Sequence, residues 1–246
     1  AEWKPSDAEA VRLPSPPDRV PTGITLVDKP GAAQSVISVG QLGVLRNSPD
    51  YFQLLVMNTI FGGQFSSRLN MNLREDKGYT YGARSSFEWR QQPGPFVASA
   101  SVQTAVTAPA LTEFLKEFHD LAGARQVAEK ELEFAKASIT RGFPANFETS
   151  RDIAGRLEDL VEYRLPNDYF NTVVPKVSAV TGNDVVRGAK KYIHPEYLNV
   201  IVVGDRSQIE SKLRELPVGE RIEVRQFDED FRLIPAKPGV GGSENP

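Results

Sequence analysis

The residues best suited to chemistry lie in one stretch, FGGQFSSRLNMNLREDKGYTYG, which spans positions 61 to 82. Within it, Arg74 stands seven positions before Tyr81. Arginine supplies a fixed fork of donors and tyrosine supplies one hydroxyl, so the two together could hold a peptide carbonyl or stabilise a developing oxyanion. The same spacing also allows a plainer interpretation, in which Arg74 is a solvated helix residue and Tyr81 shares the apolar face of a strand with Phe87.

The adjacent glycines Gly62 and Gly63 raise the question of phosphate binding, because clustered glycines before a helix expose backbone N–H groups to an anion. No glycine in the chain is followed by lysine and a hydroxyl residue, as a P-loop requires, and the dinucleotide fingerprint G-x-G-x-x-G is absent. We therefore expect these glycines to let two helices approach each other and the chain turn.

The two histidines, His119 and His194, offer no metal or triad chemistry. Each lies at the end of a predicted helix, where we interpret it as structural. Neither belongs to H-E-x-x-H or H-x-x-E-H, cysteine is absent, and a zinc site needs about three protein ligands. G-x-S-x-G, the motif of a serine nucleophile, is also missing. The sequence thus predicts no metal site in this chain and no catalytic residue that acts alone.

Composition narrows the class of protein. The chain has 246 residues, of which 40% are hydrophobic and 25% charged, and this is typical of a soluble globular protein with a substantial core. The net charge is −3 and the basic residues are dispersed, so neither a nucleic-acid binder nor a membrane-surface protein is indicated. No apolar run approaches the ~18 residues of a membrane span. The lack of cysteine fits reducing and oxidising compartments equally, so the location is left open.

Three predicted elements position the opening stretch. An apolar stripe predicts a helix over residues 49 to 61. Ser66 or Ser67 can cap a second helix, which ends near Lys77 because Gly78 stands where the chain must turn left-handed. From position 79 to 89 the odd residues are Tyr, Tyr, Ala, Ser, Phe and Trp, a period of two that predicts a half-buried strand.

The rest of the chain predicts an α+β fold with one mixed, largely antiparallel sheet and helices on one face. ITLVDKPGAAQSVISVGQLGV suggests a pair of strands, FVASASVQT a returning strand, and LNVIVVGD a buried strand. Helical stripes fill the region between, including one that begins with a capping box at Thr181 and Asp184. We expect residues 1–21, with five prolines, to be a linker from a preceding half, residues 22–235 to form the domain, and residues 236–246 to be a flexible tail.

The opening stretch resembles the glycine-rich segment of the pitrilysin and mitochondrial-processing-peptidase family, the inverzincin zinc metallopeptidases. In the second halves of those enzymes a segment of the type G-G-x-x-S-S-R-L-x-x-x-L-R-E-x-x-G-x-x-Y recurs. KPGAAQSVISVGQLG is similar to the family's first strands, SAVTGNDVVRGAKKYIHPEYLNVIVVGD to its later helix and strand, and AEWKP to the tail of a first half. The resemblance covers nearly the whole chain and implies one half of a two-half clamshell.

In that family, zinc sits in the half that bears H-x-x-E-H, and the extended substrate adds as a strand to a sheet edge. The resemblance implies that Arg74 holds a substrate carbonyl, that Tyr81 assists in binding it or in stabilising the tetrahedral intermediate, and that Gly62 and Gly63 keep the segment uncluttered. Since this chain lacks the zinc motif, we expect a non-catalytic, substrate-binding half that is inactive alone. Its partner would be a zinc-bearing half, in the same or a separate polypeptide.

Two other interpretations stay open. Related proteins of this fold serve as structural or assembly subunits, and in such a protein the Arg74 and Tyr81 pair would have no proteolytic role. A self-pairing module that binds peptides is a third possibility.

Overall fold

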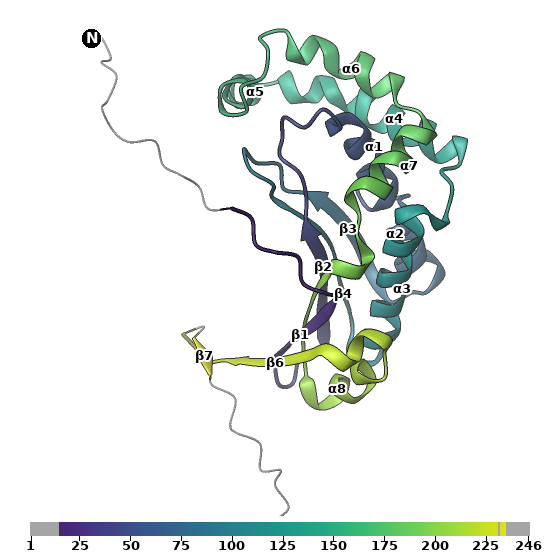
Figure 1. Cartoon of the computed structure of the whole chain (residues 1–246), viewed down its shortest axis with the longest axis vertical. Helices are drawn as coiled ribbons and strands as arrows, with labels where there is room; N and C mark the ends of the chain where they lie inside the picture. The colour runs from purple at the N-terminus through teal and green to yellow at the C-terminus, as the bar shows by residue number, and fades with distance from the viewer. Residues whose placement is uncertain (1–14, 231, 235–246) are drawn as a thin grey trace, which may run out of the picture.

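The computed structural model describes residues 15–230 and 232–234. Its centre is one open sheet of seven strands in the order β3-β4-β2-β5-β1-β6-β7 (Figure 1). The strands are β1 (Gly23–Asp28), β2 (Gln34–Leu42), β3 (Thr80–Phe87), β4 (Pro95–Gln103), β5 (Asn199–Gly204), β6 (Ile222–Phe227) and β7 (Leu233–Ile234). The pairs β1–β5 and β1–β6 are parallel, and the other neighbours are antiparallel. The predicted mixed, largely antiparallel sheet is therefore confirmed.

Helices cover one face of this sheet and leave the other largely open. They are α1 (Tyr51–Phe61), α2 (Arg68–Asn70), α3 (Thr107–His119), α4 (Glu129–Gly142), α5 (Ser150–Glu162), α6 (Tyr169–Ala179), α7 (Gly182–Tyr192) and α8 (Arg206–Arg214). In Figure 1, α1, α3 and α7 lie on the covered face, α4, α5 and α6 lie beyond one end of the sheet, and α8 lies near the other end. This arrangement confirms the predicted α+β class with helices on one face.

The core lies between the covered face and the helices, as the alternation of the strands requires. Ile37 and Val39 of β2 are buried, and they face the helix layer that contains Phe114 and Phe118 of α3. The side chains of β2 that point the opposite way, such as Val36, stay exposed. Among the described residues, no helix has both the length and the apolar character needed to cross a membrane.

The two strands predicted on either side of Lys29 and Gly31 both form, but they are not neighbours. β5 lies between them, with Val202 opposite Leu26 of β1 and Ile37 of β2. An apolar strand that is buried at the centre of a sheet takes this position because it can pack on both flanking strands. β1 and β2 therefore do not pair with each other, and each pairs with β5, which comes from the C-terminal part of the sequence.

The second helix of the opening stretch has the predicted limits but lacks the predicted side-chain cap. Ser67 occupies the position before α2, yet its side chain makes no capping hydrogen bond and its Oγ is buried without a partner among the described residues. After Asn70 the helix widens into a π-helical turn, Met71–Asp76. It ends at Lys77, and Gly78 follows with a φ of 65°, the left-handed exit that the sequence predicts.

The predicted boundaries of the domain lie mostly beyond what the structure describes. The predicted linker, residues 1–21, is described only from residue 15, and the predicted tail, residues 236–246, lies entirely outside the described residues. The division into linker, domain and tail stays a prediction.

Candidate functional site

Arg74 lies in the π-helical turn with its guanidinium open to solvent on one side. Its side chain is 39% exposed, and its Nε is 3.2 Å from Oε1 of Glu75. The guanidinium carbon stands 4.6 Å from the centre of the Phe65 ring. In the part of the chain that the structure describes, the two terminal amino groups donate no hydrogen bond, and the ion pair with Glu75 is closest at Nε. The edge of the guanidinium that makes bidentate contacts is thus free to bind an outside acceptor.

Tyr81 is 89% exposed, which no simple strand alternation would give. The register between β3 and β4 shifts between Thr80 and Ala83, as at a β-bulge, and an extra residue in one strand re-aims the side chains around it. Beyond the shift, Ala83 and Phe87 face the core. The interpretation in which Tyr81 shares the apolar face of Phe87 is therefore wrong, because the bulge turns the tyrosine outward.

The glycines bring the end of α1 against β3. The carbonyl of Gly62 accepts a hydrogen bond from the backbone N–H of Ser85 at 2.9 Å. A Cβ on Gly62 would lie 2.6 Å from that same nitrogen, closer than atoms can pack, so only glycine fits. A Cβ on Gly63 would lie 2.9 Å from Nδ2 of Asn58, within α1 itself. The expected approach of two helices is thus replaced by contact between a helix end and a strand.

Asn70 connects the loop after α1 with the bulge in β3. Its buried side-chain amide donates from Nδ2 to the carbonyl oxygen of Phe65 at 2.7 Å. Its Oδ1 accepts the backbone N–H of Ala83 at 3.0 Å. One side chain therefore fixes both the loop that carries Phe65 and the strand that carries Tyr81. The sequence pattern does not single out Asn70 or Phe65. The hydrogen bonds of Asn70 reach residues 5 and 13 positions away, and only the folded structure reveals them.

These contacts also close part of the edge of the sheet. β3 is an edge strand, and an edge strand normally offers free N–H and C=O groups to an added strand. The N–H groups of Ala83 and Ser85 point away from β4, but Asn70 and Gly62 already accept their hydrogen bonds. An extended peptide cannot pair with β3 through those two groups. A peptide near this part of the edge would meet side chains instead.

Arg68 anchors the start of the helix that leads to Arg74. Its buried guanidinium contacts both carboxylate oxygens of Glu131 at 2.8 Å and the carbonyl oxygen of Gln126 at 2.9 Å. Burial by itself would raise the pKa of Glu131, but the hydrogen bonds from Arg68 and from the N–H of Ala128 hold that pKa below its usual value. This ion pair ties the helix to α4 and so restrains the position of the turn that carries Arg74.

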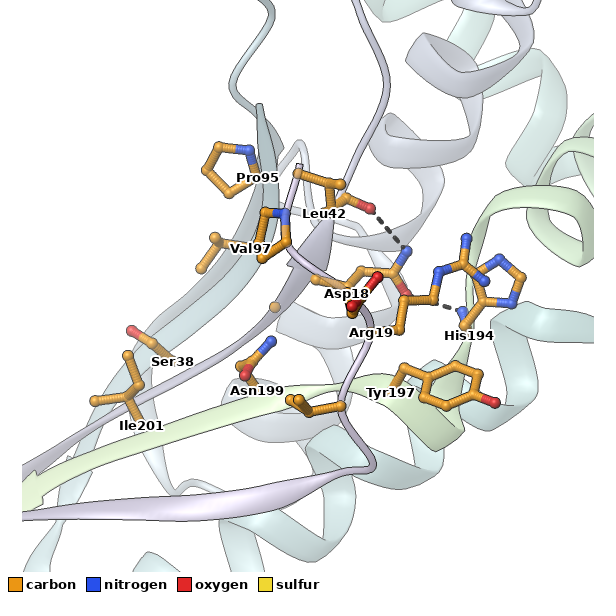
Figure 2. A pocket seen from close by; sticks show the side chains of 14 residues that line it. Asp18, Arg19, Ser38, Leu42, Pro95, Val97, His194, Tyr197, Asn199 and Ile201 are labelled. Atoms are coloured by element: carbon orange, nitrogen blue, oxygen red, sulfur yellow. Dashed lines mark hydrogen bonds between the residues drawn. The ribbon is translucent and has the colours of Figure 1, made fainter. Parts of the chain in front are cut away.

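Two of the cavities among the described residues are considered for binding, one beside these elements and one on the open face of the sheet. One, of about 460 Å³, opens beside the glycine-containing loop and is lined by residues that include Ile60, Gln64, Ser66 and Phe134. The other, of about 300 Å³, lies on the open face of the sheet, beneath the segment that contains Asp18 and Arg19 (Figure 2). Figure 2 shows Val97 and Ile201 on its sheet side and Tyr197 and His194 near Arg19. Most of this lining is apolar, so it offers packing surface and few groups for proton transfer.

The side chains that the structure describes form no cluster suited to a metal ion. Within residues 15–230 and 232–234, no group of three or more His, Asp or Glu side chains is placed to hold a metal ion. His194 has its Nδ1 3.7 Å from Oε1 of Glu196, which is one carboxylate and not a ligand set. The described side chains therefore do not provide a ligand set that fits zinc.

Comparison with known proteins places this geometry in a family. The sequence profile described as the peptidase M16 inactive domain matches residues 1–139. A search among curated proteins finds no match.

Several solved structures share the fold. The peptidase M16 inactive domain from Pseudomonas fluorescens has 26% sequence identity and a TM-score of 0.72, over 79% of this chain and 46% of that one. The inactive peptidase domain of a candidate zinc protease from Bordetella parapertussis has 19% identity and a TM-score of 0.59, over 69% and 92%. A chain of complex III2 from Candida albicans has 16% identity and a TM-score of 0.66, over 83% and 50%. The chain thus spans about half the length of the first and the last of these proteins.

Proposed function

Because this chain belongs to the peptidase M16 family, whose inactive domain it matches over residues 1–139, we propose that it is the substrate-binding half of a zinc metallopeptidase. In this proposal the chain supplies no metal and performs no hydrolysis alone. It completes a peptide-binding chamber with a second half, which bears zinc on an H-x-x-E-H motif. The second half belongs to the same polypeptide or to a separate one.

One observation carries the proposal: two exposed hydrogen-bond donors, Tyr81 on the edge strand β3 and Arg74 in the preceding π-helical turn, are carried by segments that buried contacts hold in place. The terminal amino groups of Arg74 donate no hydrogen bond among the described residues, and the bulge in β3 turns Tyr81 into solvent. An ordinary surface arginine or tyrosine does not require buried side chains that hold its segment in place. Here Gly62 and Asn70 hydrogen-bond to the strand that carries Tyr81, and Arg68 ties the helix that leads to Arg74 to α4.

The roles follow from the chemistry of the two side chains. The amino groups of Arg74 would donate to a carbonyl oxygen of the bound peptide, and the charge would favour an oxygen that becomes negative. The hydroxyl of Tyr81 would donate to the same or a neighbouring oxygen. Since the N–H groups of Ala83 and Ser85 are already bonded, this half would hold the peptide through side chains, and pairing of the peptide with a strand would fall to the other half.

A structural or assembly subunit is the second candidate. The shared fold with a chain of complex III2 supports it, because it places the fold within a large assembly. In that case the chain would bind its partner and the Arg74 and Tyr81 pair would be irrelevant to any cleavage.

Reconstitution separates the two candidates. Peptide hydrolysis is measured with a mixture of unstructured peptides for this chain alone, for the zinc-bearing half alone and for both together, with complex formation followed by size-exclusion chromatography. We expect a complex that cleaves peptides well above the sum of the separate halves. A stable complex with no activity beyond that sum would support the assembly subunit and contradict the substrate-binding half.

A further inference from the structure

We propose that Phe65 is a positioning residue for Arg74, whose ring sets the plane of the guanidinium so that the terminal amino groups face a bound peptide. This inference rests on the proposed function, since it concerns how the same site is held ready. Nothing in the sequence pattern assigns a role to Phe65, which lies between the glycines and the serines of the loop.

The first argument is the exposure of a large aromatic ring. Phe65 is 60% exposed, whereas Phe61 and Phe96 are fully buried. An exposed ring contributes little to the core, so the contact that Phe65 does make is informative. That contact is with Arg74, whose guanidinium carbon lies 4.6 Å from the ring centre.

The second argument is that the guanidinium of Arg74 contacts two different neighbours, Phe65 and Glu75. The guanidinium carbon lies over the ring of Phe65 in a cation–π contact, and the carboxylate of Glu75 lies 3.2 Å from Nε. Two different contacts on one planar group restrict its rotation, which a single surface ion pair would not do. The remaining edge, with the two amino groups, is the part that a carbonyl oxygen would meet.

The third argument is that the ring itself is fixed relative to Tyr81. Asn70 holds the carbonyl of Phe65 and the N–H of Ala83, and Gly62 is bonded to Ser85. The loop of Phe65 is thus attached at two points to the strand that carries Tyr81. The ring that contacts the guanidinium of Arg74 is therefore connected through this loop to β3, the strand that carries Tyr81.

The test compares four variants of the assembled enzyme: Phe65→Leu, Phe65→Tyr, Arg74→Ala, and the double variant that combines Phe65→Leu with Arg74→Ala. Leucine removes the aromatic face but retains an apolar side chain, and we expect kcat/KM to fall about tenfold because the guanidinium is no longer oriented. Tyrosine retains the ring and should restore kcat/KM to within about twofold of the wild type. The double variant should be no worse than Arg74→Ala alone, since a positioning residue has nothing left to position.

A matched control is Phe227→Leu on β6, near the opposite edge of the sheet, where the side chain is 41% exposed. It should leave kcat/KM unchanged. If Arg74→Ala impairs the enzyme but Phe65→Leu does not, the positioning role is wrong and the proposed function stands. If Arg74→Ala itself has no effect, the proposed function fails. Additive losses in the double variant would show that Phe65 acts independently of Arg74, and would also overturn the inference.

Discussion

Asn70 donates a hydrogen bond from Nδ2 to the carbonyl oxygen of Phe65 at 2.7 Å, and with its Oδ1 it holds the N–H of Ala83 at 3.0 Å. Because Asn70 is buried, Asn70→Ala leaves both backbone groups without their partner. We expect it to lower the free energy of unfolding by about 2 kcal/mol, measured by urea denaturation. Equal stability of the wild type and Asn70→Ala would show that these two hydrogen bonds do not contribute to the stability of the fold.

The close approach of Gly62 to β3 gives a second prediction. In Gly62→Ala the new Cβ would lie 2.6 Å from the nitrogen of Ser85, so the loop or the strand must shift. We expect a loss of about 2 kcal/mol in the free energy of unfolding, typical of an overpacked site.

The matched control for Gly62 is Gly155, which lies inside α5 with no atom within 4 Å of an added Cβ. Gly155→Ala should stabilise the protein by roughly 0.5 to 1 kcal/mol, because alanine has the higher helix propensity. If the two substitutions changed stability by the same amount and sign, the contact between Gly62 and Ser85 would not be the cause.

The ion pair between Arg68 and Glu131 predicts a dependence of stability on pH. The pKa of Glu131 in the folded protein lies below its usual value of 4.5, so the pair contributes fully above pH 4.5 and its contribution is lost as the pH falls through the lowered folded pKa. Glu131→Gln removes this titration. The difference in unfolding free energy between the wild type and Glu131→Gln should therefore be constant near neutral pH and shrink below pH 4.5. A difference that grows on acidification would contradict the assignment.

Removing Arg68, the other member of the pair, should lower the free energy of unfolding more than Glu131→Gln does. Arg68 is buried, and Arg68→Ala leaves the partly buried carboxylate of Glu131 without its main partner. We expect a loss of about 3 kcal/mol, measured by thermal or chemical unfolding at neutral pH. A loss below about 1 kcal/mol would place the pair among ordinary surface ion pairs.

Tyr81→Phe tests the hydroxyl alone, since the exposed ring is retained. If the hydroxyl donates to an oxygen that becomes negative during hydrolysis, its loss should reduce kcat of the assembled enzyme about tenfold, with little change in stability. A change confined to KM would indicate a role in binding the ground state only. Unaltered kcat and KM would remove Tyr81 from the site.

The sequence predicts the elements around the site well, because local rules determine them. The helix before Gly62, the exit at Gly78 and the capping box at Thr181 depend on neighbouring residues, and all three are present. The family resemblance, which is confirmed, is also carried by continuous segments of the sequence.

Features that depend on distant parts of the chain were not predictable in this way. The period of two places Tyr81 on the core face, and only the register with β4 reveals the bulge that turns it outward. The insertion of β5 between β1 and β2 requires pairing across more than 150 positions. Helix α6 and strands β6 and β7 lack strong start signals, and β6 is mostly exposed, so its sequence has no clear apolar alternation.

The most direct test of the proposed function is the turnover of the assembled enzyme with Arg74→Ala. Its matched control is Arg225→Ala on β6, where a 42% exposed arginine likewise approaches a nearby glutamate through Nε. We predict that Arg74→Ala lowers kcat/KM about a hundredfold, while zinc content and complex formation stay at the wild-type level and Arg225→Ala has no effect. Wild-type turnover for Arg74→Ala in an intact, zinc-loaded complex would contradict a substrate-binding role for this half.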